Sequence, residues 1–252
     1  MPSTINGIGT TYYGKKNPVS YQGVCESCGS ETMLEDYECT LFFCLVFIPI
    51  IPLGRKQIIG YCRGCTRHKA MPLIEWQRIK EDAIDKGLAE LAENKGKPEV
   101  AMQLLRTLTT FHEQEQAKQL AAATQSQFQD DVDVQLGLGT WYEESDHLAE
   151  SNRCFDRAYE LDPQHPGAIR ARGITILQAG QLEEAHVMLA QLAPPSPGYD
   201  PTVFFLLGTA YQERHQHEKA IEMFALIQQN SPDWAKDKSF RKALKKSQKA
   251  RA

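Results

Sequence analysis

The sequence of 252 residues lacks the motifs of the common enzyme classes. It has seven histidines, and none belongs to a His-Glu-x-x-His pair or lies beside a nucleophile motif. It also has no glycine-rich loop of the kind that binds phosphate groups. The acidic pairs Glu143-Glu144 and Glu183-Glu184 are more simply read as solvated charges on helices. We therefore expect a protein without enzymatic activity.

The sequence also lacks a segment that would cross a membrane as a helix. Its most apolar run, Leu41 to Leu53, has thirteen uncharged residues, well below the ~20 that a spanning helix needs. Pro49 and Pro52 within the run oppose a continuous helix. The start, Met1-Pro2-Ser3-Thr4, has neither the charged region nor the apolar stretch of a secretory signal. We expect a cytoplasmic protein whose thiols are reduced.

Four of the seven cysteines form two Cys-x-x-Cys pairs, Cys25 with Cys28 and Cys62 with Cys65. Each pair can supply two ligands from one tight turn, and the 33 residues between Cys28 and Cys62 are enough for two strands. Four thiolates can surround one metal ion tetrahedrally, and such a closed set leaves no coordination position for catalysis. The spacing predicts a structural zinc site with these four cysteines as ligands.

Other chemistries remain open for this region. Iron suits the same four thiolates, and a redox function would use a single Cys-x-x-Cys pair beside a strand-helix unit, which the sequence does not show. Cys39, Cys44 and His68 lie near enough in the sequence to be further ligands. We expect Cys39 and Cys44 to pack in a core as small apolar residues. We expect His68, between Arg67 and Lys69, to be a solvated surface residue.

The apolar run 41–53 is rich in β-branched and aromatic residues, which favours strands. We expect its prolines to mark a sheet edge or a break, and Gly54-Arg55-Lys56 to turn the chain into a strand at Gln57–Tyr61. The result would be a small antiparallel sheet that carries the metal at one end. An apolar run in so small a domain can leave an exposed patch, which would be a docking surface or a shallow membrane contact.

Further residues accompany the two cysteine pairs. They are Tyr13-Gly14-Lys15, Leu41-Phe42-Phe43 and the phrase Ile48-Pro49-Ile50-Ile51-Pro52-Leu53. With these residues, the first 70 positions resemble the zinc-ribbon domains found at the N-terminus of mainly microbial proteins. The resemblance implies that the four paired cysteines bind zinc and that the apolar region belongs to the strands of the ribbon. It implies no reaction.

The C-terminal half contains an internal repeat with a period of about 34 residues. Gly139, Gly173 and Gly208 are spaced 34 and 35 residues apart, and other positions keep step with them. Small residues would let two antiparallel helices approach closely, larger ones would fill the space beside them, and a proline would end the second helix. The aligned sets are Ser151, Ala185 and Ala220; Phe155, Leu189 and Phe224; Tyr142, Ile176 and Tyr211; and Pro163, Pro197 and Pro232.

These units resemble tetratricopeptide repeats. The middle unit matches less well, because Arg172 stands where its neighbours carry Leu138 and Leu207. The resemblance implies a solenoid of helix pairs whose groove holds a peptide or a helix of a partner. It places these residues on the groove side: Leu136, Thr140, Glu143, Arg170, Ile174, Gln178, Phe205, Thr209 and Gln212.

The predicted fold is a small β zinc ribbon followed by an all-α solenoid of tetratricopeptide-like helix pairs. Upstream of the three repeats, Ile74–Ala92 is predicted to be a helix. Ala101–Leu108 and Ala117–Phe128 are predicted to form a degenerate repeat, which lacks the glycine. The predicted segments are a zinc-ribbon domain at 1–70, a helical region with the degenerate repeat at 73–131, three repeats at 132–232, and a basic capping helix or tail at 233–252.

Charge is distributed unevenly along the chain. Residues 71–232 carry 13 basic against 25 acidic side chains, a net of −12. This net charge disfavours nucleic acid and favours basic or neutral proteins as partners of the repeats. Residues 233–252 carry eight basic against two acidic side chains. Trp234, Phe240 and Leu244 in this segment favour a helix that caps the solenoid.

The sequence therefore favours a non-enzymatic, zinc-binding adaptor or scaffold, whose repeat groove binds a peptide or helix of a partner protein. One alternative is a membrane-peripheral scaffold that uses residues 41–53. Another is a nucleic-acid-associated factor, for which a net charge of +2 over residues 1–70 is a weak signal. That factor would use the cations and aromatic side chains of the ribbon: Lys15, Lys16, Arg55, Lys56, Arg63, Arg67, Tyr12, Tyr13 and Tyr61.

Overall fold

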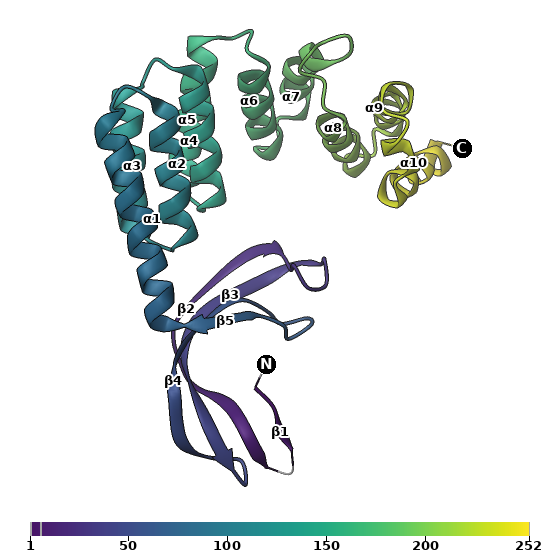
Figure 1. The fold of residues 1–252 in the computed structure, drawn as a ribbon. Helices are drawn as coiled ribbons and strands as arrows, with labels where there is room; N and C mark the ends of the chain where they lie inside the picture. Colours follow the sequence, from purple (N-terminus) through teal and green to yellow (C-terminus); the bar gives the residue numbers. More distant parts are fainter. Residues whose placement is uncertain (1, 6, 252) are drawn as a thin grey trace. The chain divides into compact units, whose positions relative to one another are not determined.

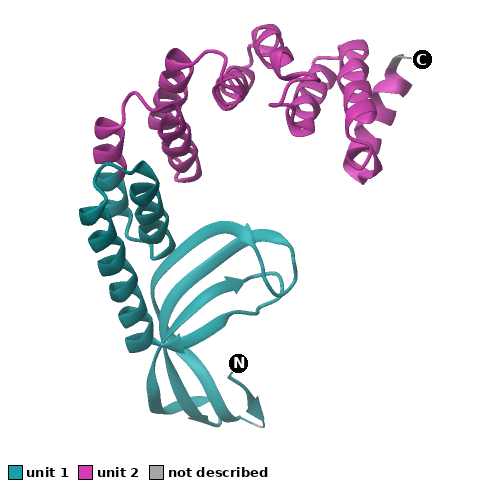
Figure 2. Ribbon diagram, turned by 45° about the horizontal axis from the view of Figure 1, so that its top comes forward, with its two compact units in different colours: residues 1–120 teal, residues 121–252 magenta. Residues whose placement is uncertain are grey.

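The computed structural model describes residues 2–5 and 7–251. Within these residues the chain forms an antiparallel sheet followed by helices (Figure 1). It divides into two compact units, residues 1–120 and residues 121–252 (Figure 2). The segment 1–70 is thus part of a larger unit that includes the first helices. None of the helices described is both long and apolar enough to span a bilayer.

Five strands form one antiparallel sheet in chain order. The two strands expected between the cysteine pairs are both present, as β3 and β4. Figure 1 shows the connections that follow β2 and β4 at one end of the sheet and the turn between β3 and β4 at the other. The strands are β1 (Thr4–Ile5), β2 (Ile8–Val24), β3 (Glu31–Leu45), β4 (Ile48–Cys62) and β5 (Lys69–Pro72).

The long strands curl near their middle, where their pairing shifts register. β2 and β3 lose register between Tyr13 and Lys16 and again between Lys16 and Val19. β3 and β4 do so between Glu35 and Tyr37. Such irregularities bend a strand and increase its local twist. They account for the curled form of the sheet in Figure 1.

The turn between β3 and β4 lies at Val46-Phe47, so the predicted turn at Gly54-Arg55-Lys56 is wrong. β4 continues through the predicted turn from Ile48 to Cys62. Gly54 lies opposite Leu41 in the ladder, next to a register shift. Val46 and Phe47 have φ angles of +52° and +63°. Turns with two positive φ angles normally carry Asn-Gly or Asp-Gly, so no local sequence signal marked this one.

The sheet is followed by helices joined by short connections. Proline occupies the start of α2, α6 and α8, where its missing N–H costs nothing. The predicted helix at Ile74–Ala92 corresponds to α1. The helices are α1 (Leu73–Glu93), α2 (Pro98–Thr110), α3 (Gln114–Gln127), α4 (Val132–Glu144), α5 (Leu148–Leu161), α6 (Pro166–Gln178), α7 (Leu182–Leu189), α8 (Pro201–Glu213), α9 (His217–Asn230) and α10 (Lys238–Arg251).

A buried carboxylate, Asp36, connects the sheet to the helices of the first unit. Its Oδ1 accepts hydrogen bonds from the backbone N–H of Gly60 at 2.7 Å and from the hydroxyl of Tyr21 at 3.2 Å. Its Oδ2 lies 2.9 Å from Nε2 of His112, between α2 and α3. Burial, and then the charge of Asp36, raise the pKa of Tyr21 to about 12. These three partners satisfy a carboxylate that would be costly to bury alone.

The glycines of the three repeats face the large side chains aligned with them. A Cβ at Gly139 would lie 2.4 Å from Cε1 of Phe155, and one at Gly173 would lie 2.4 Å from Cδ2 of Leu189. A Cβ at Gly208 would lie 2.5 Å from Cε1 of Phe224. No real Cβ tolerates such distances, so these glycines allow the close approach of α4 with α5, α6 with α7, and α8 with α9. The predicted role of the aligned glycines is confirmed.

A fourth glycine contact joins α1 to α2. A Cβ at Gly87 would lie 2.7 Å from Cδ1 of Leu104, and the two helices pack as a pair. The predicted degenerate repeat grouped α2 with α3 instead. Gly87 belongs to the helix predicted at Ile74–Ala92, outside the aligned repeats, so its role as a packing glycine was not predicted.

The helix α10 packs on the last repeat. Phe240 and Leu244 are buried against α8 and α9, and Phe240 lies 5.7 Å from Phe224 between ring centroids. Trp234 contacts Phe205 in the same aromatic cluster, with centroids 5.6 Å apart. The apolar side of α10 thus covers the end of the solenoid core.

Candidate metal centre and helical hollow

The two Cys-x-x-Cys segments form the same turn twice at one end of the sheet. In the first, Cys25 donates its backbone N–H to Ser30 at 2.9 Å, and Gly29 donates to the carbonyl of Cys25 at 2.8 Å. In the second, Cys62 donates to Arg67 at 3.0 Å, and Thr66 donates to Cys62 at 2.7 Å. Gly29 and Thr66 have φ angles of +69° and +60°. This shared geometry turns both thiol pairs toward one point.

The four sulfur atoms have the spacing of a tetrahedral metal site. All four Sγ atoms lie within 4.8 Å of one another. The distance from Cys25 to Cys65 is 3.7 Å, and that from Cys28 to Cys62 is 4.0 Å. A tetrahedron with zinc-sulfur bonds of ~2.3 Å has sulfur atoms about 3.8 Å apart. The residues fit one metal ion, and the geometry suits zinc and iron equally.

The backbone around the sulfurs favours thiolates at two of the four positions. Hydrogen bonds from the backbone N–H and then the hydroxyl of Ser30 lower the pKa of Cys28 to about 6. The backbone N–H of Cys65 lowers the pKa of Cys62. The N–H of Arg67 acts in the same direction on Cys65, but burial and bonds from neighbouring thiols outweigh it and raise that pKa to about 11. Because four thiolates at this spacing repel one another, a cation is needed to deprotonate the full set.

The site is closed on its inner side. Cys25 and Cys62 are buried together with Leu34, and Tyr21 and Cys65 pack against them. With four sulfur ligands and this cover, a bound metal would have no open coordination position for a substrate. The arrangement can therefore hold the two turns together at one end of the sheet, but it offers no site for catalysis.

Cys39 and Cys44 lie away from the four-sulfur group and are buried within the sheet. Burial raises the pKa of Cys39 to about 11, so its thiol is neutral at physiological pH. The expectation that both cysteines pack as small apolar residues is confirmed.

The expectation that His68 is a solvated surface residue is wrong. Its ring lies between Tyr12 and Tyr61, with centroid distances of 5.6 and 5.9 Å. Neither ring nitrogen has a hydrogen-bond partner within the part of the chain that the structure describes. Burial lowers the pKa of His68, so the imidazole is neutral at physiological pH. Two tyrosines that would have to be free for nucleic-acid stacking are thus engaged by His68.

Two cations of the sheet are also engaged. Lys15 forms an ion pair with Glu35 at 2.5 Å, and Arg55 forms one with Glu38. These pairs reduce the positive charge that the sheet presents to an anionic partner.

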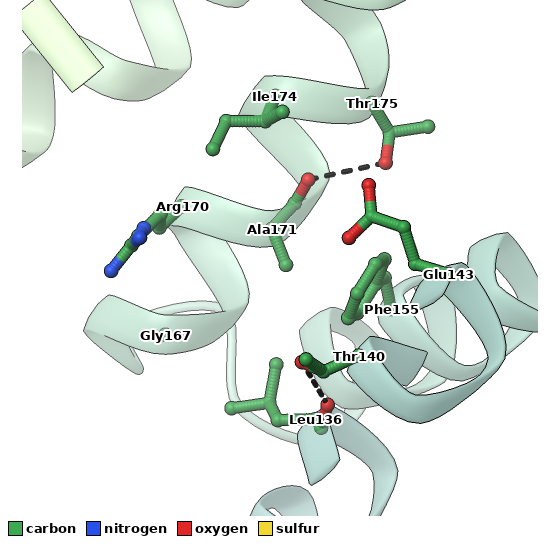
Figure 3. A pocket seen from close by; sticks show the side chains of 9 residues that line it. All are labelled: Leu136, Thr140, Glu143, Phe155, Gly167, Arg170, Ala171, Ile174 and Thr175. Carbon is green, nitrogen blue, oxygen red and sulfur yellow. Dashed lines mark hydrogen bonds between the residues drawn. The ribbon is translucent and has the colours of Figure 1, made fainter. Parts of the chain in front are cut away.

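A hollow of about 320 Å³, open to solvent, lies between α4 and α6 (Figure 3). Five of the nine residues predicted for the groove line it: Leu136, Thr140, Glu143, Arg170 and Ile174. Phe155, Gly167, Ala171 and Thr175 complete the lining and were not predicted. A Cβ at Gly167 would lie 2.8 Å from Cδ1 of Leu136, so this glycine leaves room for the Leu136 side chain.

Apolar side chains form much of this hollow, and charged groups stand at its edges. The hydroxyls of Thr140 and Thr175 donate to carbonyls of their own helices, at 3.0 and 3.1 Å. The guanidinium of Arg170 lies 3.2 Å from the carboxylate of Asp200. Figure 3 shows Glu143 reaching from α4 toward α6. The hollow can accept an apolar side chain while Glu143 and Arg170 contact polar groups beside it.

The other four predicted groove residues lie outside this hollow. Gln178 is exposed at the end of α6, and Thr209 donates its hydroxyl to Leu206 at 2.8 Å. Phe205 packs into the aromatic cluster under α10. Gln212 is 7% exposed and donates to the carbonyl of Ala243 and the hydroxyl of Ser247. The capping helix covers the last two positions.

The chain matches no protein-family model and no curated protein. Among solved structures, MamA matches with a TM-score of 0.50 at 17% identity, over 66% of this chain and 99% of the MamA chain. YrrB, a TPR protein with an unusual peptide-binding site, matches with a TM-score of 0.49 at 20% identity, over 64% and 82% of the chains. A thermophilic TPR protein of Thermus thermophilus matches with a TM-score of 0.46 at 17% identity, over 69% and 94%.

At these identities the likeness is one of fold. The MamA match and the glycine-mediated helix pairs agree, and the helices of this chain form a tetratricopeptide-like solenoid.

Proposed function

We propose that this protein is a zinc-binding adaptor without enzymatic activity. In this proposal the sheet is a zinc ribbon, held by Cys25, Cys28, Cys62 and Cys65, and the helical repeats bind a peptide or helix of a partner protein. The observation that carries the second part is the open hollow of α4 and α6, which collects five of the residues that the repeat register assigns to a groove.

The chemistry of the hollow defines the kind of peptide that would fit. Leu136, Ile174 and Phe155 offer apolar contact for one buried side chain of the partner. Glu143 offers a carboxylate to a basic residue next to that side chain. The net charge of −12 over residues 71–232 would attract the same basic residue at long range. The partner segment is therefore an apolar residue flanked by Lys or Arg.

The test uses peptides selected from a random library on the zinc-loaded full chain. Thr140→Arg places a long side chain in the hollow from an exposed helical position, where Arg is a good helix former. We expect it to weaken binding of the selected peptides at least tenfold, measured by fluorescence anisotropy.

The matched control is Asn152→Arg, which adds the same charge at an exposed position of α5 that does not line the hollow. It should leave the dissociation constant unchanged. Equal affinities for Thr140→Arg and wild type, or a library that yields no binder, would overturn the proposed groove.

A further inference from the structure

The half of the sheet remote from the cysteine turns has no charged side chain. Residues 2–14 and 39–54 contain no Asp, Glu, Lys, Arg or His. These residues supply β1, the first part of β2, the second part of β3 and the first part of β4. Charged residues begin where this half ends, at Lys15, Glu38 and Arg55. The sheet is therefore amphiphilic along its length, with an apolar end and a charged end.

The apolar end finishes in an exposed hairpin tip, formed by Leu45, Val46, Phe47, Ile48, Ile50, Ile51 and Leu53. All seven side chains are exposed, and Val46 and Phe47 at the turn are 67% and 66% exposed. Successive side chains of a strand point to opposite faces of the sheet. Because Leu45 to Ile48 are consecutive, the tip is apolar on both faces and at its end.

The turn itself carries residues that its backbone disfavours. A positive φ is a steric outlier for a β-branched residue such as Val46. Two positive φ angles in a two-residue hairpin turn favour Asn-Gly. The sequence places two bulky apolar residues there instead, and both are exposed to solvent. Such a conflict between local preference and observed residue is expected at sites that serve a function.

We propose that the hairpin tip inserts into the interface of an anionic lipid bilayer. A rigid protein surface covers one face of a flat hairpin, whereas a fluid lipid layer surrounds both faces and the end. Residues 48–54 of β4 lie on a sheet edge, because β4 pairs with β5 only from Lys56 to Ile59. Strand pairing of this edge with a second copy is disfavoured, because Pro49 and Pro52 remove two of its N–H donors.

Positive charge borders the apolar end at a depth where it can attract anionic lipid headgroups. Lys15 and Arg55 are paired with Glu35 and Glu38, and Lys16 and Lys56 leave a net charge of +2 at this level. Thr40 is opposite Arg55 and lies six residues from Val46, which is about 20 Å along a strand. With the tip inserted by ~5–10 Å, the cations lie about 10–15 Å from the headgroups, a distance comparable with the Debye length of about 10 Å at 0.1 M salt. The proposal does not depend on the groove of the helical repeats.

The test is flotation of the zinc-loaded full chain with vesicles of 70% phosphatidylcholine and 30% phosphatidylserine. The key variant carries Val46→Asn and Phe47→Gly, which removes both apolar side chains and supplies the residues that the turn favours. Its sheet should be at least as stable as that of the wild type, checked by metal content and thermal unfolding. We expect the wild type to float with the vesicles and the variant to lose at least tenfold in vesicle affinity.

The matched control carries Leu148→Ala and Val187→Ala, which also removes two exposed apolar side chains, on α5 and α7. It should float as the wild type does, and vesicles of phosphatidylcholine alone should bind the wild type more weakly. Failure of the wild type to float, or equal flotation of the V46N/F47G variant, would overturn the proposal. So would a wild-type dimer that V46N/F47G makes monomeric without any flotation, since the tip would then be a self-association surface.

Discussion

At the scale of single residues, missing side chains set the spacing of the helix pairs. Gly87, Gly139, Gly173 and Gly208 each face a large side chain at a distance that leaves no space for a Cβ. The cost of glycine in a helix, up to ~1 kcal/mol relative to alanine, is offset here by closer packing of the paired helix. Replacing these glycines with alanine should therefore lower the free energy of unfolding, although alanine has the higher helix propensity.

We predict that Gly139→Ala lowers the free energy of unfolding of the second unit by about 1–3 kcal/mol. The new methyl group would overlap the ring of Phe155, and this overlap outweighs the gain in helix propensity. Urea denaturation followed by circular dichroism measures the change. Asn152→Ala is the control, because it adds alanine at an exposed position of α5 in the same unit. The packing role would be contradicted if Gly139→Ala were as stable as Asn152→Ala.

A buried thiol gives the second unit a dependence on alkaline pH. Burial raises the pKa of Cys154 from 9.0 to about 11, and the sulfur accepts a hydrogen bond from Nε2 of Gln125 at 3.2 Å. The unfolded thiol loses its proton first as the pH rises. The stability due to the neutral buried thiol is therefore complete below about pH 9 and is lost as the pH approaches 11.

We predict that the urea midpoint of the wild type falls between about pH 8.5 and about pH 10.5 by more than that of Cys154→Ser. Serine keeps an acceptor for Gln125 but does not ionise in this range. The two proteins are compared in parallel denaturation curves at each pH. An equal fall in both would show that Cys154 contributes nothing to the pH dependence.

At the scale of elements, the metal site connects the ends of strands that are far apart in the sequence. Cys25 follows β2 and Cys62 ends β4, and the two turns repeat the same hydrogen bonds. Structural zinc in small domains contributes about 10–16 kcal/mol, as much as the whole stability of an ordinary domain. The second unit has its own core around Phe204, Phe224 and Phe240, so we expect its stability not to depend on a metal bound to the sheet.

We predict that a strong chelator at neutral pH unfolds the sheet and leaves residues 121–252 folded. Limited trypsin digestion with mass spectrometry measures this, because Arg55, Lys56, Arg63 and Arg67 provide cleavage sites within and beside the sheet. These sites should become sensitive while fragments from the second unit persist. Cys62→Ser should show the same pattern without chelator. Protection of the sites after verified metal loss would contradict a structural role of the metal.

Elements with a strong local pattern could be predicted from the sequence, and contacts that depend on tertiary structure could not. The spacing of Gly139, Gly173 and Gly208 predicted the repeats, because each glycine and its partner belong to one helix pair. The turn at Val46-Phe47 was missed, because its residues contradict its backbone. His68 was misjudged, because the tyrosines that bury it come from two different strands.

The same distinction between local sequence pattern and tertiary contact applies to the candidate sites. The four candidate metal ligands could be named from their spacing alone, since two short turns bring the thiols together. The groove residues predicted on α4 and α6 that line the hollow follow from the repeat register, because α10 does not cover them. It was not predicted that α10 would cover Phe205 and Gln212, because that contact depends on how the last helix packs.

At the scale of the whole molecule, each unit carries one or more candidate sites. The first unit holds the four sulfurs and the apolar hairpin tip, and the second unit holds the hollow between helices. This distribution fits the proposed adaptor, in which the metal module and the repeat surface would bind separate targets.

The proposed function depends first on whether the four cysteines bind one zinc ion, and element-resolved metal content per chain measures this. The measurement uses untagged protein purified without added metal, beside a variant that carries Cys28→Ser and Cys62→Ser. We predict one zinc ion per wild-type chain and none in the variant. One iron per chain would contradict zinc as the metal of this site, and a wild type without metal would contradict the site itself.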